Sequence, residues 1–362
     1  MHTKKLFFCV LGSTLVGAAL AAQPASEMDT HINAAKTAAG LDYRATFVNL
    51  CFTGANPGAG LARAGGTGAP GAPGAAGRGA GPGAGAAGPG APARGAGGGG
   101  AATPDRASWY ASPYKIFDNF YWLGSRQFSS WALRTSEGII IIDTNFAYTT
   151  EPEILDGLKT LGLDPKQIKY VIISHAHGDH DQGAAELQKR FGAKVVMGAA
   201  DWESTLARPA TATGGVPTRD ISVDSAGRKL TLGDTTIDIV LTPGHTPGTL
   251  SYVFPVKDQG RTVMVAYSGG TLTGAFGADG ARWDEYIESQ KRIGKAAADA
   301  GASVLLSNHS EYDNAYTKAR LIAAKREVGE EHPFIVGAAG VQRYFTVMTE
   351  CATASKMRAG AK

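Results

Sequence analysis

The sequence has almost no excess of charge of either sign. Its 362 residues include 35 Lys and Arg against 32 Asp and Glu, a formal net charge of +3 with histidine neutral. Several arginines fall in a stretch of low complexity and form no cluster. Proteins that attract nucleic acid or anionic membranes usually carry a strong positive field. The composition therefore indicates neither kind of partner, and we expect a small-molecule substrate.

Long uninterrupted apolar sequence is also lacking. The run Leu6 to Leu20 falls short of the roughly 20 apolar residues that a membrane-spanning helix needs. Lys4 and Lys5 precede it, and Ala19-Leu20-Ala21 at its end has the small-x-small pattern of a signal peptidase site. Residues 1–21 are therefore predicted to be a secretory signal peptide, with a membrane anchor as the alternative. Its removal would leave a periplasmic or secreted protein without a stable membrane span.

Cysteine is rare, with three in the whole chain. Cys9 falls within the predicted signal peptide, which leaves Cys51 and Cys351 in an export pathway where disulfides persist. A Cys51–Cys351 bridge would join the start of the mature chain to its end, and in the chain-entropy model it would stabilise the fold by about 4 to 5 kcal/mol. The alternative is two free buried thiols, since spacing alone cannot show that the sulfurs meet.

Bulky apolar side chains are nearly absent from residues 53–103. Gly, Ala and Pro with scattered Arg make up almost all of this stretch, and Leu61 is its one large apolar residue. Such a segment buries too little surface to offset the entropy cost of ordering its backbone, so we expect a disordered insert. A collagen helix is disfavoured because glycine does not recur at every third position. Residues 22–52 form an N-terminal segment, with a helix expected over 28–41 and an extended piece over 43–52.

The remaining residues, 104–362, have the apolar patterning of one catalytic domain. Runs rich in aromatic and β-branched residues predict strands, and apolar residues at helical spacing predict helices. Strands are expected at 115–123, 130–135, 138–143, 169–174, 194–197, 229–232, 236–241, 249–256, 262–267 and 303–307, and helices at 151–161, 183–191, 283–300, 315–328 and 333–349. Helices do not alternate strictly with strands, so the expected fold class is a layered α/β (α+β) arrangement of two mixed sheets with helices outside.

The stretch richest in reactive side chains is Ser174-His-Ala-His-Gly-Asp-His180, which follows the apolar run 171–173. Three imidazoles and one carboxylate within six residues are hard to explain by packing. In an extended turn His175 and His177 can point the same way and chelate one metal, which leaves Asp179 and His180 for a second ion nearby. Zinc is favoured because its borderline softness suits imidazole combined with carboxylate.

Two later histidines stand at the ends of predicted strands. His245 lies in Thr242-Pro-Gly-His-Thr-Pro-Gly248, where glycine and proline fix a tight loop and keep bulk away from the imidazole. His309 follows the apolar run 303–307. Both occupy strand-to-loop junctions, where rigid elements can aim a ligand. His31 and His332 have no companion ligand in the sequence around them, and we expect both to be ordinary histidines.

Together these motifs resemble the metallo-β-lactamase superfamily. The order His-x-His-x-Asp-His, Gly-His-Thr-Pro-Gly and a late histidine after a strand is that family's, and the resemblance covers roughly residues 104–349. It implies a four-layer αβ/βα sandwich with two zinc ions per chain at one edge between the sheets. Asp143 resembles the family's buried aspartate that supports the metal loop. The implied ligands are His175, His177 and His245 for one zinc, and Asp179, His180 and His309 for the other.

Residues 269–271 separate subfamilies. Glyoxalase II, many lactonases and the tRNA-processing nucleases have Gly-Asp-Thr there, with an aspartate that bridges both metals, whereas this sequence has Gly269-Gly270-Thr271. Subclass B1 and B2 β-lactamases have a cysteine ligand in this region, which is absent here. The chain therefore looks most similar to subclass B3 β-lactamases. In these a Ser-x-Ser segment helps to hold the substrate carboxylate. Thr271 and Thr273 could supply equivalent hydroxyls, with strand-end hydrogen bonding as their alternative role.

By this resemblance the expected activity is hydrolysis of the β-lactam amide by a zinc-bound hydroxide, since zinc lowers the pKa of a bound water toward about 7. Asp179 would orient the nucleophile as well as bind metal. The main alternative is an ester, lactone or thioester substrate, because the superfamily reuses one metal core for many substrates. A non-catalytic exported zinc-binding protein is disfavoured, because structural zinc sites are usually closed four-ligand arrangements. The sequence does not indicate an oligomeric state.

Overall fold

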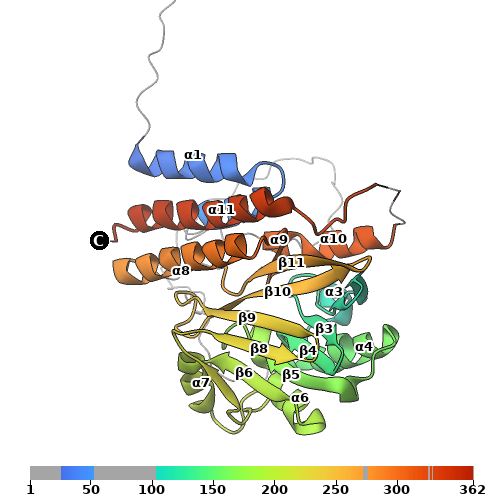
Figure 1. Cartoon of the computed structure of the whole chain (residues 1–362). Coiled ribbons are helices and arrows are strands. Elements are labelled where there is room, and N and C mark those ends of the chain that lie inside the picture. The colour runs from blue at the N-terminus through green and yellow to red at the C-terminus, as the bar shows by residue number, and fades with distance from the viewer. Residues whose placement is uncertain (1–25, 53–102, 272–275, 325–326, 328, 362) are drawn as a thin grey trace, which may run out of the picture.

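The protein folds into two β-sheets packed face to face, with helices on the outer face of each (Figure 1). The structure, a computed structural model, describes residues 26–52, 103–271, 276–324, 327 and 329–361. One sheet is covered by α8 (Gly280–Asp299) and α11 (Gly337–Arg358), and the other by α4 (Asp156–Thr160), α6 (Ala184–Phe191) and α7 (Ala199–Leu206). This is the predicted four-layer αβ/βα sandwich, and the predicted fold class is confirmed.

The first sheet has seven strands in chain order. They are β1 (Tyr114–Phe117), β2 (Phe120–Trp122), β3 (Trp131–Thr135), β4 (Gly138–Ile142), β5 (Ile168–Ile172), β6 (Lys194–Gly198) and β7 (Ile221–Val223). Strands β1 to β4 pair antiparallel, and β4 to β7 pair parallel. Parallel neighbours need a crossover connection, and α4, α6 and α7 supply one each on the outer face.

The second sheet has five strands in the order β12-β11-β10-β9-β8. They are β8 (Arg228–Leu232), β9 (Thr235–Leu241), β10 (Leu250–Asp258), β11 (Arg261–Ser268) and β12 (Val304–Ser307). Strands β8 to β11 form an antiparallel meander, and β12 joins β11 in parallel after the crossover helix α8. Gln259 and Gly260 both have positive φ, as the two-residue turn between β10 and β11 requires.

The alternation of side chains along β4 shows how the core is divided. Ile140 and Ile142 point between the sheets and pack with Tyr252 and Leu306 of the second sheet. Ile139 and Ile141 point to the other side, into the cluster formed with the helices that cover the first sheet. All four isoleucines are fully buried. Both faces of this sheet are covered, which explains why its central strands are continuous apolar runs.

The N-terminal segment packs on the far end of the chain. Helices α1 (Glu27–Ala39) and α2 (Arg44–Cys51) both contact α11, and Figure 1 shows α1 on the side of α11 that faces away from the sheet. A disulfide joins Cys51 to Cys351, with an S–S distance of 2.03 Å. The extended piece predicted over 43–52 is wrong, because this stretch is the helix α2. Its β-branched and aromatic residues favour strand, but Leu50 and Cys51 are buried on a helical face against α11.

Several other element boundaries differ from the sequence prediction. The strand predicted at 115–123 is the hairpin β1–β2, and α7 and β7 were not predicted. The helix predicted at 315–328 ends at Ile322, and α11 starts four residues later and ends nine residues later than predicted. The remaining elements are short: α3 (Arg106–Trp109), η1 (Ala147–Thr149), η2 (Thr150–Leu155), η3 (Pro165–Gln167), α5 (Gly178–Asp181), α9 (Ser310–Asp313) and α10 (Ala315–Ile322).

Two predictions concern residues that the structure does not describe. The signal peptide at 1–21 lies outside the described residues, and so does the insert at 53–103 except for Thr103. Within the described part of the chain, no helix combines the length and apolarity needed to cross a bilayer.

Candidate metal centre

Six potential ligands meet where the strands of both sheets end at one edge. His175 and His177 lie in the loop after β5, and Asp179 and His180 lie in α5, which follows directly. His245 lies in the loop between β9 and β10, and His309 is the second residue after β12. The two sheets therefore bring together residues that are up to 134 positions apart in the sequence. All six predicted ligands are in this cluster.

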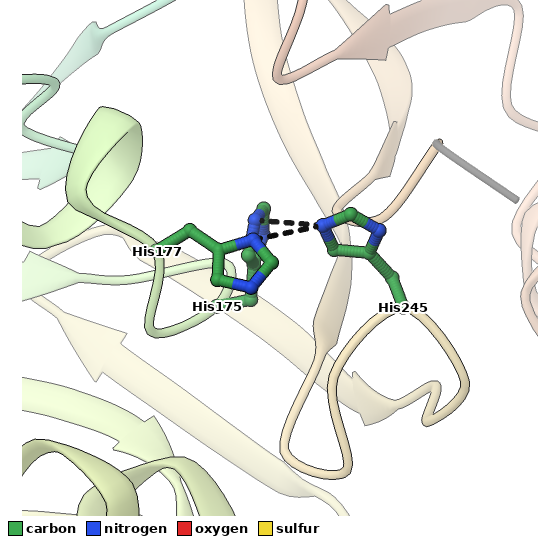
Figure 2. A group of neighbouring side chains, drawn as sticks. All are labelled: His175, His177 and His245. Carbon is green, nitrogen blue, oxygen red and sulfur yellow. Dashed lines mark hydrogen bonds between the residues drawn. The ribbon is translucent and has the colours of Figure 1, made fainter. Parts of the chain in front are cut away.

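His175, His177 and His245, called here the three-histidine group, point their ring nitrogens at one another (Figure 2). His245 Nε2 lies 3.1 Å from His175 Nε2 and 3.2 Å from His177 Nδ1. Nitrogen atoms bound about 2.0–2.1 Å from a tetrahedral zinc ion lie about 3.3 Å apart. The observed separations match this value, so the geometry of the group fits a bound zinc ion.

Asp179, His180 and His309, called here the Asp179 group, form the adjacent cluster. His180 Nε2 lies 3.2 Å from His309 Nε2, and Asp179 Oδ2 lies 3.5 Å and 3.6 Å from these two nitrogens. The ligand atoms of His175, Asp179 and His180 are also within 4.8 Å of one another, so the two groups are neighbours. A histidine pair with one carboxylate again suits zinc. The fold and the donor set imply a metal site.

Asp143 supports the Asp179 group by contacting the ring of His180, in the position that the sequence resemblance implies. Its carboxylate is fully buried and lies 3.1 Å from His180 Nδ1. It also accepts hydrogen bonds from the Ser174 backbone N–H at 2.6 Å, the Ser174 hydroxyl at 2.8 Å and the Tyr267 hydroxyl at 2.9 Å. Asp143 has a φ of 57°, an unfavourable conformation for a side-chain-bearing residue, which these contacts maintain. With Nδ1 of His180 facing this carboxylate, Nε2 is left to face the metal position.

A carbonyl group orients His175 in the same way. His175 Nδ1 lies 3.0 Å from Gly269 O, and Asn308 Nδ2 donates to the same carbonyl at 2.8 Å. This leaves His175 Nε2 directed toward His245. The role of Asn308 was not predicted, although it directly precedes the ligand His309 in the sequence.

The protonation states of these groups follow from burial and from their charged neighbours. Burial, together with His180 and His245, lowers the pKa of His175 well below its usual value. Burial also acts to lower the pKa of His180, but Asp179 and the hydrogen bond to Asp143 outweigh it and raise the pKa. For Asp179, burial acts to raise the pKa, but His180 and His309 outweigh it and lower the pKa. At neutral pH His175 is a neutral imidazole and Asp179 a carboxylate, the states that bind metal.

Charged side chains that the sequence did not single out hold the ligand loops. Asp201 in α7 accepts hydrogen bonds from the backbone N–H groups of Ala176 and Gly248. Arg208 donates to the Ala176 carbonyl at 2.7 Å, and Arg282 donates to the His245 carbonyl at 3.0 Å. Acidic and basic residues are common in any sequence, and no local pattern marks these three. They become apparent only when the fold brings them to the loops.

The residues that separate the subfamilies lie beside the three-histidine group. A Cβ atom on Gly270 would lie 2.7 Å from His245 Cβ and 2.9 Å from Thr249 Cγ2, closer than such contacts occur in proteins. The backbone at this position therefore packs directly on the His245 loop. Thr271 is buried, and its hydroxyl donates to Asn308 Oδ1 at 3.4 Å, so it contacts the protein here. Thr273 lies outside the described residues.

Of the three histidines outside the cluster, His2 lies outside the described residues, and His31 and His332 have ordinary roles, as expected. His31 lies on α1, and its Nδ1 is 2.5 Å from Glu350 of α11. His332 is buried, stacks on Phe117 and lies 2.7 Å from the Ile116 carbonyl through Nε2.

Comparison with known proteins gives one family and two kinds of relative. A family model described as the metallo-β-lactamase superfamily matches residues 123–258, which include every candidate ligand except His309. The chain is 34% identical to the hydroxyacylglutathione hydrolase of Acidiphilium cryptum over 88 residues, 24% of this chain and 31% of that protein. It is 29% identical to that of Mesorhizobium japonicum over 141 residues, 37% of this chain and 47% of that protein. The chain thus spans less than half the length of both curated relatives.

Among solved structures, the fold matches that of a subclass B3 metallo-β-lactamase of Bradyrhizobium japonicum with a TM-score of 0.57 and 26% sequence identity. The match covers 69% of this chain and 95% of that chain. This structural likeness extends along almost the whole of the other protein, whereas the likeness to the curated hydrolases is partial.

Proposed function

This chain carries a metallo-β-lactamase domain, and from that premise we propose that it is a zinc-dependent hydrolase that opens the amide bond of β-lactams. We propose two metal ions per chain, one held by the three-histidine group and one by the Asp179 group. The support for two ions is geometric, because each group offers three donor atoms at separations suited to one ion.

The proposed substrate class rests mainly on the surroundings of Gly270. In the enzymes that have Gly-Asp-Thr at this point, a carboxylate bridges both metals. Here the side-chain direction of residue 270 is filled by His245 and Thr249, so an aspartate would displace the loop that holds a ligand. Among the described residues, position 270 therefore offers neither a bridging carboxylate nor the space for one. This arrangement supports an activity of the subclass B3 kind, as does the structural likeness to a B3 enzyme over 95% of its length.

Zinc bound at both groups would lower the pKa of a water molecule toward about 7 and polarise the carbonyl oxygen of the substrate. Asp179 is placed to hold that water, because its carboxylate lies beside His180 and His309 and its side chain is 23% exposed. Because Oδ2 faces the metal position, the other carboxylate oxygen, Oδ1, can accept a hydrogen bond from the water and so direct its oxygen lone pair toward the substrate. His177 is the most exposed of the three histidines in its group, and we propose that substrate approaches from its side.

A thioester is the second candidate substrate, and the curated relatives favour it. Both are hydroxyacylglutathione hydrolases, and one is 34% identical over 88 residues. The match covers less than half of each of these enzymes, so the likeness supports shared metal chemistry more than a shared substrate. We also propose export to the periplasm or the medium, which a disulfide-bonded protein tolerates well.

A side-by-side turnover assay separates the two substrates. The purified, zinc-loaded protein would be given a chromogenic cephalosporin in one series and a hydroxyacylglutathione thioester in the other. We expect turnover of the cephalosporin, loss of that turnover with a chelator, and recovery when zinc is added back. Turnover of the thioester alone would replace the proposed substrate. Full zinc binding with no turnover in a wider panel of penicillins, carbapenems, lactones and thioesters would reject catalysis itself.

A further inference from the structure

Asp201 is a buried acid that belongs to no metal group. It lies in the first turn of α7, directly beyond the end of β6, and its residue is 1% exposed. An isolated buried carboxylate is costly, so a folded protein retains one only where hydrogen bonds compensate for the loss of water. The partners of this carboxylate therefore show what it is for.

The partners of Asp201 come from the two loops that carry the three-histidine group. Asp201 Oδ2 accepts hydrogen bonds from the Ala176 backbone N–H at 2.8 Å and from the Thr246 hydroxyl at 2.7 Å. Asp201 Oδ1 accepts one from the Gly248 backbone N–H at 2.9 Å. Ala176 lies between His175 and His177 in the sequence, and Thr246 directly follows His245. One carboxylate is thus bonded to both loops, within one to three residues of all three imidazoles.

Two glycines allow this contact. A Cβ on Gly198 would lie 2.0 Å from the Gly248 carbonyl oxygen, and a Cβ on Gly248 would lie 2.6 Å from Asp201 Cγ. The backbone before α7 and the backbone after His245 therefore touch directly. The second glycine of the Gly-His-Thr-Pro-Gly motif is needed here for the close approach of Asp201.

The opposite side of the Ala176 residue is held as well. Arg208, which follows α7, donates to the Ala176 carbonyl at 2.7 Å and forms an ion pair with Asp181 at 2.7 Å. The N–H and the carbonyl of Ala176 are therefore both bound by charged side chains. Asp201 binds the N–H and Arg208 the carbonyl, and the two lie seven residues apart.

We propose that Asp201 is a positioning residue that sets the distance between the His175–His177 loop and the His245 loop, and so the metal affinity of the three-histidine group. It touches neither the metal position nor the substrate. It acts by holding two backbones at the separation at which three imidazoles face one ion. The inference rests on the proposed metal site but not on the proposed substrate.

The test is metal binding by Asp201→Asn, which preserves the size of the side chain. All three partners of the carboxylate are donors, whereas an amide offers one acceptor oxygen and a donating NH₂, so one donor must face another donor. The zinc and Co²⁺ affinities of the full chain would be measured by competition with a chromophoric chelator, and the Co²⁺ absorption spectrum would be recorded for each equivalent. We expect one of two equivalents to bind about 10- to 100-fold more weakly, with the other unchanged.

Asp220→Asn is the matched control. Asp220 also accepts a backbone N–H, from Val195 at 3.0 Å, and a side-chain amide N–H, from Gln188 at 2.6 Å, but it contacts neither ligand loop. The Asp220→Asn variant should bind both metal equivalents with the affinities of the unaltered protein. If Asp201→Asn does not fold, Thr246→Val removes one of the three donors and should give a smaller loss in the same equivalent.

The outcomes separate this inference from the proposed function. Unchanged affinity in Asp201→Asn, or equal weakening of both equivalents, would overturn the positioning role. If the unaltered protein binds no zinc, the proposed metal site fails and the inference fails with it. If zinc binds as expected but no substrate is turned over, the role of Asp201 still stands on the metal titration alone.

Discussion

The three-histidine group and the Asp179 group lie side by side, but the protein holds them in different ways. Around the three-histidine group, Asp201, Arg208 and Arg282 bind main-chain atoms of the ligand loops. Under the Asp179 group, the Asp143 carboxylate contacts the ring of a ligand, His180, directly. The nearest equivalent for His175 is the neutral carbonyl of Gly269.

This difference separates two ways of supporting a metal ligand. A charged side chain that binds the backbone fixes where a ring lies without contacting the ring itself. A carboxylate on the ring fixes its orientation and also makes it a stronger base. Burial lowers the pKa of His175 well below its usual value, whereas at His180 Asp179 and the hydrogen bond to Asp143 outweigh burial and raise the pKa.

Removing one ligand from each group should have the largest effect. We expect His245→Ala to lose one metal equivalent and His309→Ala to lose the other, each with at least about a 10³-fold fall in turnover, since a bound metal supplies several kcal/mol of charge stabilisation. Metal content by mass spectrometry of the intact protein, with steady-state kinetics, measures both effects. His31→Ala removes a histidine on α1 and should keep both metals and full turnover. Loss of both metals from either ligand variant would show that the groups are one cooperative site.

Asp143→Asn should weaken metal binding by an intermediate amount. The loss should fall on the Asp179 group, whereas Asp201→Asn should affect the three-histidine group. The four groups around the carboxylate, two from Ser174 and one each from Tyr267 and His180, all face it as donors. An amide cannot accept from all of them, so we expect about 10- to 100-fold weaker binding at the Asp179 group. Tyr267→Phe removes one of these donors and should give a smaller loss. If Asp143→Asn weakened only the three-histidine group, the division of support described above would be wrong.

The smallest effect is expected from a buried acid that contacts neither group. Glu153 is buried, accepts a hydrogen bond from Asn145 at 3.2 Å, and burial raises its pKa to about 8 from the usual 4.5. Between these values the folded protein holds a proton that the unfolded chain has released. The stability that depends on neutral Glu153 is therefore fully present below pH 4.5 and is lost as the pH rises to about 8.

Residue 153 cannot ionise in Glu153→Gln, so this variant should not lose that stability as the pH rises. Between pH 5 and pH 8 the free energy of unfolding of the unaltered protein should fall by more than about 1 kcal/mol relative to that of the variant. Urea unfolding of both zinc-loaded proteins at the two pH values measures this. Glu151→Gln, at a half-exposed neighbour, should show no such gain. Parallel pH curves for all three proteins would show that Glu153 is ionised in the fold.

The fold and the ligand cluster could be predicted because local sequence specifies both. Strands such as β4 and β5 are continuous apolar runs, and the ligands are a rare residue type at strand ends. The helix α2 was mistaken for an extended piece because a contact with α11, 300 residues away, outweighs its local preference.

The supporting residues could not be predicted for a related reason. Asp201 and Arg208 bind backbone atoms of a ligand loop, and any loop sequence offers those. Asn308 binds the Gly269 carbonyl, which also faces His175. Their roles depend on where α7 and β12 place them relative to the loops. Asp143 was found only because its place at the end of an isoleucine run resembles a known family.

The Cys51–Cys351 disulfide turns almost the whole protein into a covalent ring. Every sheet, every candidate ligand and all of residues 53–102 lie in the chain between these two cysteines. A single cut anywhere in that stretch opens the ring but leaves one molecule, because α2 remains bonded to α11. The protein can therefore be nicked once between residues 53 and 102 without releasing a fragment, and only reduction together with the cut would separate the two pieces.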